Sequence, residues 1–161
     1  MENVMARRTR GSFRTDREGD LGWVAVAAVS GESILLVQDA RASHPHLWQL
    51  PRKRTYPMES EMEAGRRILG LIMRRTIYAR AFDYLDTVRF GRQRAEVFLI
   101  NVSLEDATAF ESREKNPEMQ GKFFAFQDVL AMSDLNNEDR PFLKAIATSE
   151  EDEAAKMPQT P

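Results

Sequence analysis

The sequence contains no cysteine, and it has two histidines among its 161 residues. Without cysteine, disulfide frameworks, thiolate zinc sites and cysteine nucleophiles are excluded together. The two histidines, His44 and His46, lie on either side of Pro45 in a polar segment. A metal site would need further ligands that the sequence does not offer, so we expect both imidazoles on the surface of a loop.

Long apolar runs and an excess of either charge are also missing. The longest apolar run, residues 24–29, is far shorter than the roughly 20 residues of a membrane-spanning helix, and no signal-peptide core follows the arginine-rich start. We therefore expect a cytoplasmic protein with no membrane partner. The net charge of −2, from 23 basic and 25 acidic residues, excludes a globally basic nucleic-acid binder but leaves room for local basic patches.

The length is that of one domain with a core of its own. Residues 1–20 are rich in arginine and poor in apolar side chains, which predicts a flexible basic arm. Residues 149–161 begin with four consecutive acids from 150 to 153 and end in a proline-containing segment, which predicts a disordered acidic tail. The folded domain is expected between them, over residues 21–148.

Hydrophobic periodicity divides the domain into strands and helices. Apolar runs predict strands at 23–29 and 34–37, an extended piece at 47–51 and a loop at 52–57. From Glu59 a three- and four-residue period predicts a helix of about four turns, with acids at its start and Arg74 and Arg75 in its last turn. A hairpin over 82–104, a polar loop over 105–120, a strand at 123–126 and an amphipathic closing helix complete an α+β sandwich.

The segment from Leu47 to Leu69 resembles the signature of the Nudix family. In that family a strand ending in Trp-x-Leu-Pro-Gly-Gly precedes the box Gly-x5-Glu-x7-Arg-Glu-U-x-Glu-Glu-x-Gly-U, where U is bulky and apolar. Here Trp48, Leu50 and Pro51 match the strand, and Glu59 and Arg67 match the first glutamate and the arginine. The resemblance covers roughly residues 22 to 148 and implies a Nudix-like α/β/α sandwich with a mixed sheet, one long box helix and a C-terminal helix.

The box departs from the family at its functional positions. The glutamate after the arginine falls on Ile68, and the adjacent glutamate pair falls on Leu71 and Ile72. Nudix enzymes resemble one another in using those glutamates to hold magnesium against a diphosphate. Magnesium needs oxygen ligands, which isoleucine and leucine side chains lack. The resemblance therefore implies a pseudoenzyme, or a weak pyrophosphohydrolase at most, with no cofactor expected.

An alternative keeps the hydrolase and its magnesium. Glu63 lies one helical turn after Glu59, so that their side chains share a face, and Glu96 begins the strand after the hairpin. These three acids would be catalytic in a divergent magnesium-dependent enzyme, with Glu59 and Glu63 as metal ligands. The simpler interpretation is that Glu59 and Glu63 are solvated residues at the start of a helix and that Glu96 is an ordinary strand residue.

The substitutions in the box are largely basic. Residues 52–80 carry eight basic and three acidic residues, a balance of 8 − 3 = +5, and arginine matches phosphate oxygens well. We therefore consider a phosphate-containing small molecule or RNA as the partner, against the alternative of a solvated basic face. The candidate ligand-binding residues are Lys53, Arg54, Tyr56, Arg67, Arg74 and Arg75.

The predicted helix is also more apolar than one buried face requires. The apolar positions run over residues 68–73, interrupted by Gly70. Either packing fills the space of the lost metal site, or this face binds a protein partner. Three hypotheses thus remain open: a non-catalytic phosphate, nucleotide or RNA-binding module, a divergent hydrolase, and a purely structural interaction subunit.

Overall fold

The structure is a computed structural model that describes residues 22–78, 81–113 and 116–156. The predicted basic arm lies outside these residues. The elements follow in the order β1 (Trp23–Ser30), β2 (Ser33–Asp39), β3 (Arg52–Arg54), α2 (Glu61–Met73), β4 (Phe82–Phe90), β5 (Gln93–Asn101), α3 (Leu104–Glu111), β6 (Met119–Ala125), α4 (Phe126–Val129) and α5 (Arg140–Lys156). This order confirms the predicted α+β class.

Six strands form one mixed sheet with the order β4-β5-β1-β2-β6, and β3 pairs with β1 outside that path. The β1–β5 pair is parallel, and the other pairs are antiparallel. On one side β1 has two successive partners, because its start pairs with β3 (Trp23↔Arg54) and its end pairs with β2 (Ser30↔Ser33). Strand β3 thus occupies the place where β1 and β2 diverge, and its three basic residues run from buried Arg52 to exposed Arg54.

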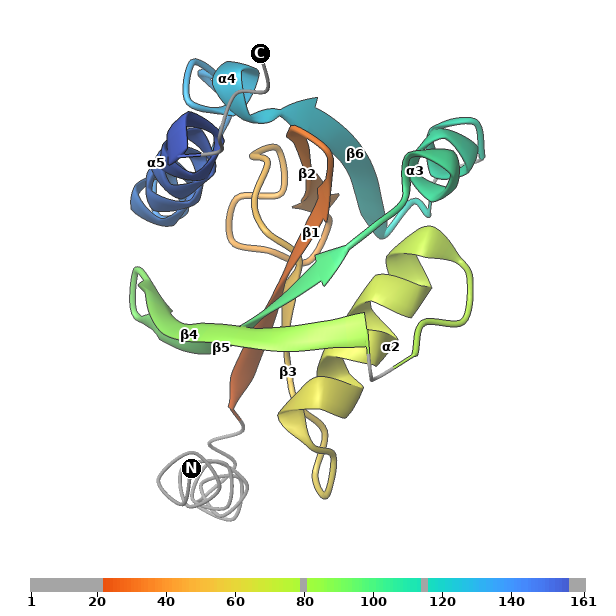
Figure 1. The fold of residues 1–161 in the computed structure, drawn as a ribbon. Helices are drawn as coiled ribbons and strands as arrows, with labels where there is room; N and C mark the ends of the chain where they lie inside the picture. The colour runs from red at the N-terminus through yellow and green to blue at the C-terminus, as the bar shows by residue number, and fades with distance from the viewer. Residues whose placement is uncertain (1–21, 79–80, 114–115, 157–161) are drawn as a thin grey trace, which may run out of the picture.

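The sheet separates two apolar cores. Along β1, residues 24, 26 and 28 face the core under α2, whereas residues 25, 27 and 29 face the core under α5. A strand covered on both faces reads as one continuous apolar run, which explains why β1 shows no alternation of polar and apolar residues. Figure 1 shows α2 and α3 on one side of the sheet and α5 on the other, the three layers expected for an α/β/α sandwich.

Helix α2 begins after Ser60, whose side chain accepts a hydrogen bond from the backbone N–H of Glu63. Ser60 is therefore the N-cap of the helix, a position that serine commonly occupies. The helix ends at Met73, because Arg74 adopts the left-handed conformation with φ 55°. Arg74 and Arg75 consequently lie beyond the helix, and the prediction that they occupy its last turn is wrong.

Three further segments differ from the sequence-based prediction. Residues 52–54, expected in a loop, form β3, because their backbone completes the hydrogen bonding of β1. Residues 105–111, also expected in a loop, belong to α3, which buries Ala107 and Phe110. Helix α5 continues to Lys156, past the boundary at residue 148, and residues 157–161 lie outside the described residues. In the part of the chain that is described, no helix is long and apolar enough to cross a membrane.

Candidate functional site

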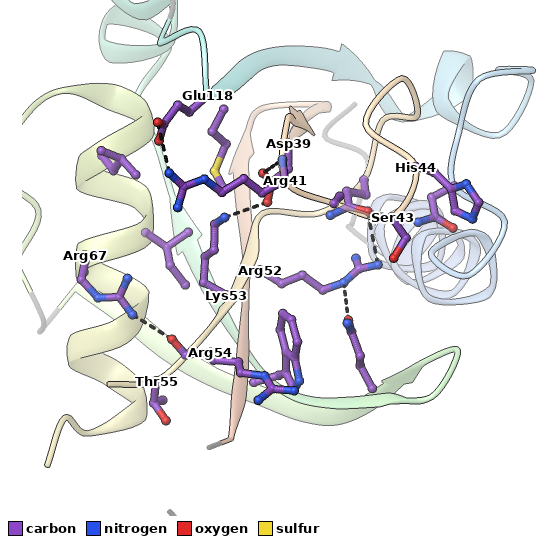
Figure 2. A pocket seen from close by; sticks show the side chains of 18 of the residues that line it. Asp39, Arg41, Ser43, His44, Arg52, Lys53, Arg54, Thr55, Arg67 and Glu118 are labelled. Atoms are coloured by element: carbon purple, nitrogen blue, oxygen red, sulfur yellow. Dashed lines mark hydrogen bonds and ion pairs between the residues drawn. The ribbon is translucent and has the colours of Figure 1, made fainter. Parts of the chain in front are cut away.

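A cavity of about 560 Å³ opens beside β3, where β1 and β2 diverge. Its walls come from β3 and the residues after it, from α2, from the loop that follows β2, and from the segment before α5 (Figure 2). The volume lies in the usual range for small-molecule sites. The lining includes five cationic side chains, three carboxylates, several amides and hydroxyls, and an apolar strip on α2.

The two box residues that match the family form one ion pair. The Arg67 guanidinium donates to both carboxylate oxygens of Glu59, at 3.0 Å each, and also to the backbone oxygen of Arg54 at 2.9 Å. The backbone N–H of Tyr56 donates to the same carboxylate at 3.0 Å, and the Tyr56 ring lies under the guanidinium at 3.7 Å. Glu59 and Arg67 therefore hold the loop from β3 onto the start of α2.

Electrostatics agrees with this structural role for Glu59. Burial raises the pKa of its carboxyl, but the hydrogen bonds from Arg67 and Tyr56, together with the Arg67 charge, outweigh burial and bring the pKa below its ordinary value of 4.5. The carboxylate is thus ionised at neutral pH, with both oxygens engaged by protein donors.

The helix wall of the cavity is apolar where the family box has glutamates. Ile68 and Leu71 line the cavity, and Leu71 keeps 47% of its surface exposed. Ile72 points away from the cavity into the core under the sheet. The apolar stripe of α2 is therefore mostly core packing, and Leu71 is its one exposed member.

The residues present do not fit a magnesium site. Hydrocarbon side chains supply no oxygen ligands, and among the described residues no group of three histidine, aspartate or glutamate side chains is placed to hold a metal ion. Glu63 is exposed at the start of α2, while Glu96 accepts a hydrogen bond from the Thr87 hydroxyl at 2.9 Å. None of the three acids of the hydrolase alternative lines the cavity with Ile68 and Leu71.

The structure brings together four of the six predicted ligand-binding residues. Lys53, Arg54, Tyr56 and Arg67 line the cavity, whereas Arg74 and Arg75 do not. Both lie beyond the other end of α2, where Arg75 forms an ion pair with Asp106 of α3. The proposed basic surface is thus divided between the two ends of the helix.

The cations of the cavity differ in how far they are neutralised. Lys53 pairs with Asp39 at 2.9 Å, and Arg41 pairs with Glu118 at 3.4 Å. The Arg54 guanidinium lies over the Trp23 ring at 5.2 Å, and within the described part of the chain it has no carboxylate partner. Figure 2 shows Lys53 directed toward Asp39 and Arg41 directed toward Glu118. Among the cations of the cavity, Arg54 is therefore the one whose charge is least neutralised by a neighbouring carboxylate.

Sequence reasoning missed a buried polar network behind the cavity. Arg52 stands where the family has a glycine, and its guanidinium donates to both carboxylate oxygens of Asp139, at 3.0 and 2.9 Å. Asp139 also accepts from the backbone N–H of Leu50 at 2.7 Å. Burial raises the pKa of this carboxyl, and the Arg52 charge and the Leu50 N–H oppose that rise. The sequence marks Asp139 only as part of a helix start, and nothing in it points to Arg52 as the partner.

The remaining aromatic and imidazole groups are placed largely as predicted. Trp48 is half-buried and packs edge-on against Phe124, with 4.9 Å between ring centroids, which agrees with a core role. His44 and His46 are both exposed in the loop after β2. His44 also lines the cavity, a placement that the loop prediction did not include.

A turn on the far side of the network is packed closely against the segment before α5. Gly91 in the β4–β5 turn has φ 62°, and a Cβ atom at this position would overlap the carboxylate of Glu138. Glu138 lines the cavity and directly precedes Asp139. Glu138 therefore contacts the turn through its side chain and the network through its backbone N–H, which donates to Asn136 Oδ1.

Comparison with solved structures identifies the fold. A mutT/nudix family protein from Listeria innocua superposes with a TM-score of 0.62 and 16% identity, over 88% of this chain and all of the other. NrtR from Shewanella oneidensis gives a TM-score of 0.65 and 19% identity over 84% of this chain, which spans 65% of NrtR. The Bacillus subtilis pyrophosphohydrolase BsRppH gives 0.55 and 14% identity, over 88% and 87% of the two chains.

At such low identities the likeness establishes the fold alone, and it confirms the predicted Nudix fold. No family model matches the sequence. Curated protein sequences likewise give no match.

Proposed function

We propose that this Nudix-fold domain is a non-catalytic module that binds a phosphorylated small molecule, a nucleotide being the leading class. The observation that carries the proposal is the make-up of the cavity walls. The α2 wall presents Ile68 and Leu71, while the β3 wall presents Lys53 and Arg54. The β3 wall therefore offers cationic donors to an anion, and the α2 wall offers no carboxylate to a metal.

Binding without metal follows from the chemistry of these donors. A guanidinium satisfies phosphoryl oxygens directly, at a fixed planar geometry, and Arg54 is free to do so. Trp23 lies beneath that guanidinium and lines the cavity, which provides an aromatic surface next to the charge. A diphosphate with an attached nucleoside matches this combination better than inorganic phosphate does.

The other hypotheses have less support. The hydrolase alternative needs Glu59, Glu63 and Glu96 to act together, but none of the three lines the cavity, and Glu59 is engaged by Arg67. A protein partner on the box helix would have Leu71 as its main apolar contact, because most of the stripe is buried. Nucleic acid remains an outcome of the test, because one of the similar structures is NrtR complexed with a 27mer DNA.

The direct test is calorimetric titration with ADP and pyrophosphate, in EDTA and again with magnesium, using adenosine as the uncharged control. We expect ADP to bind in EDTA, adenosine to bind much more weakly, and the affinity to fall as salt increases. Arg54→Ala should weaken ADP binding about tenfold or more, because a hydrogen bond to a charged group is lost. Arg74→Ala is the matched control, since Arg74 lies outside the cavity.

Two results would overturn the proposal. One is magnesium-dependent release of phosphate or nucleoside monophosphate that Glu59→Gln abolishes. The other is a wild-type protein that binds neither ADP nor pyrophosphate, while a single-stranded RNA or a protein partner binds and responds to Lys53→Glu with Arg54→Glu.

A further inference from the structure

One guanidinium group holds two carboxamide side chains at the cavity wall. Arg52 donates through Nε to Gln93 Oε1 at 3.2 Å and through Nη2 to Gln49 Oε1 at 3.4 Å. Gln49 precedes β3 and Gln93 begins β5, and both line the cavity. The guanidinium itself is fixed by Asp139 on its remaining side. Two amides from distant parts of the chain therefore flank a single buried cation.

Donor and acceptor chemistry determines which way these amides face. A guanidinium has five N–H donors and no acceptor, so only the amide oxygens can point at Arg52. The third amide of the network agrees. Asn136 Oδ1 accepts the backbone N–H of Glu138 at 3.0 Å, so its Nδ2 is left to donate to Gln49 Oε1, at 3.1 Å. Neither glutamine can flip without placing N–H groups against N–H groups.

The amide nitrogens of both glutamines are then left without a protein acceptor in the described part of the chain. The Gln49 side chain is especially informative, because only 6% of the residue surface is exposed. The single fully buried and unpaired side-chain polar atom among the described residues is Ser30 Oγ, so Gln49 Nε2 retains access to solvent. Since Gln49 lines the cavity, its N–H groups are available there to a ligand.

We propose that Gln49 and Gln93 donate hydrogen bonds to phosphoryl oxygens of the bound ligand, and that Arg52 and Asp139 are the positioning residues that turn both amides toward it. The inference rests on the proposed function and deepens it by assigning the neutral donors that accompany Arg54. Phosphoryl oxygens accept hydrogen bonds and donate none when ionised, so they match a wall of amide N–H groups. Arg52 acts mainly through the glutamines, because all three of its guanidinium nitrogens already donate to Asp139, Gln49 or Gln93 and the residue is 4% exposed.

Replacement of each glutamine by glutamate tests the donors with little change of shape. Gln93→Glu and Gln49→Glu keep an oxygen for Arg52 and replace the N–H groups with a second oxygen that repels an anion. Gln127→Glu adds the same charge on the exposed surface of α4, outside the cavity. We expect each cavity variant to weaken the binding of ADP and of pyrophosphate in EDTA about tenfold or more relative to Gln127→Glu.

A neutral variant and a spectroscopic readout separate the donors from charge and folding. Gln93→Met removes the N–H groups without adding charge, and it should also weaken binding while thermal unfolding shows a folded protein. The side-chain amide NMR signals of Gln49 and Gln93 should shift when ADP is added. In Arg52→Lys these shifts should diminish, because a lysine ammonium cannot hold both amide oxygens as a planar guanidinium does.

The outcomes distinguish this inference from the function on which it rests. If the wild type binds ADP but both glutamate variants bind it as tightly as Gln127→Glu, the assignment of the donors is wrong and the proposed function stands. If the wild type binds neither ADP nor pyrophosphate, both proposals are wrong.

Discussion

Two arginines of the box region each form an ion pair, and they do so in opposite settings. Arg67, at the position where the family also has arginine, pairs with Glu59 eight residues earlier, and their side chains keep 26% and 14% of their surface exposed. Arg52, at a position where the family has glycine, pairs with Asp139 87 residues away, at 4% and 0% exposure. The first pair closes a local loop, whereas the second joins β3 to the start of α5 and orients the amides of the cavity.

The domain depends most strongly on paired charges where the pair is buried. An isolated charge is costly in a buried site and nearly free in an exposed one. Arg52 and Asp139 must therefore be kept or replaced together, while Glu59 and Arg67 tolerate separate changes better.

The largest effect is expected at the buried pair. Asp139→Ala should lower the free energy of unfolding by about 3–5 kcal/mol, because it leaves the Arg52 guanidinium buried without a counter-ion. Urea denaturation of this variant is the measurement, with Asp134→Ala on the exposed side of the same segment as the control.

The double variant Arg52→Met with Asp139→Leu sharpens the test. We expect it to recover most of the lost stability, because replacing both partners removes the uncompensated charge. It should still bind ADP less tightly than the wild type, since the glutamine amides lose their orientation. Equal destabilisation by the single and the double variants would contradict the interpretation of the pair.

A smaller, pH-dependent effect is expected at the pair of Glu59 and Arg67. The folded-state pKa of Glu59 lies below its ordinary value of 4.5, so the ionised carboxylate stabilises the fold above that pH. This contribution is lost as the pH falls through the folded-state pKa. Glu59→Gln should therefore cost about 1 kcal/mol at pH 7, and the difference from the wild type should shrink as the pH is lowered below 4.5.

Thermal unfolding of both proteins between pH 7 and pH 3 provides the measurement. A difference in stability that stays constant across this range would show that the carboxylate charge of Glu59 plays no part.

The smallest effect is expected at Arg41 and Glu118, whose side chains are 75% and 62% exposed. Arg41→Ala should change the free energy of unfolding by less than about 0.5 kcal/mol, because exposed pairs are well solvated and gain little. Thermal unfolding would detect a larger change. Such a change would mean that burial does not determine the relative importance of the three pairs.

The sequence allowed the fold to be predicted in outline because its signals are local. The apolar runs of β1 and β2, the spacing of Glu59 and Arg67, and the period of α2 all lie within a few dozen residues. Helix α3 was missed because residues 104–111 bury only Ala107 and Phe110. Its one clear signal was Ser103, which caps the helix by accepting from the N–H of Asp106.

The candidate site was predicted only in part because it depends on contacts between distant segments. Lys53, Arg54, Tyr56 and Arg67 lie close to one another in the sequence, and the cavity contains all four. Arg74 and Arg75 also lie nearby, yet α2 carries them away from the cavity. The network of Arg52 with Gln49, Gln93 and Asp139 joins three parts of the chain, and charged residues give no sign in a sequence of being buried.

The loop between β3 and α2 offers a site for a label that detects ligand binding in the cavity. Met58 in this loop is 95% exposed and has φ 70°, whereas an added Cβ at Gly91 in the β4–β5 turn would overlap the Glu138 carboxylate. Since the sequence contains no cysteine, Met58→Cys would give it a single attachment point for a fluorescent dye. The dye would stand two residues from Tyr56 on the cavity wall, so that one labelled protein could report ligand entry optically and without a catalytic assay.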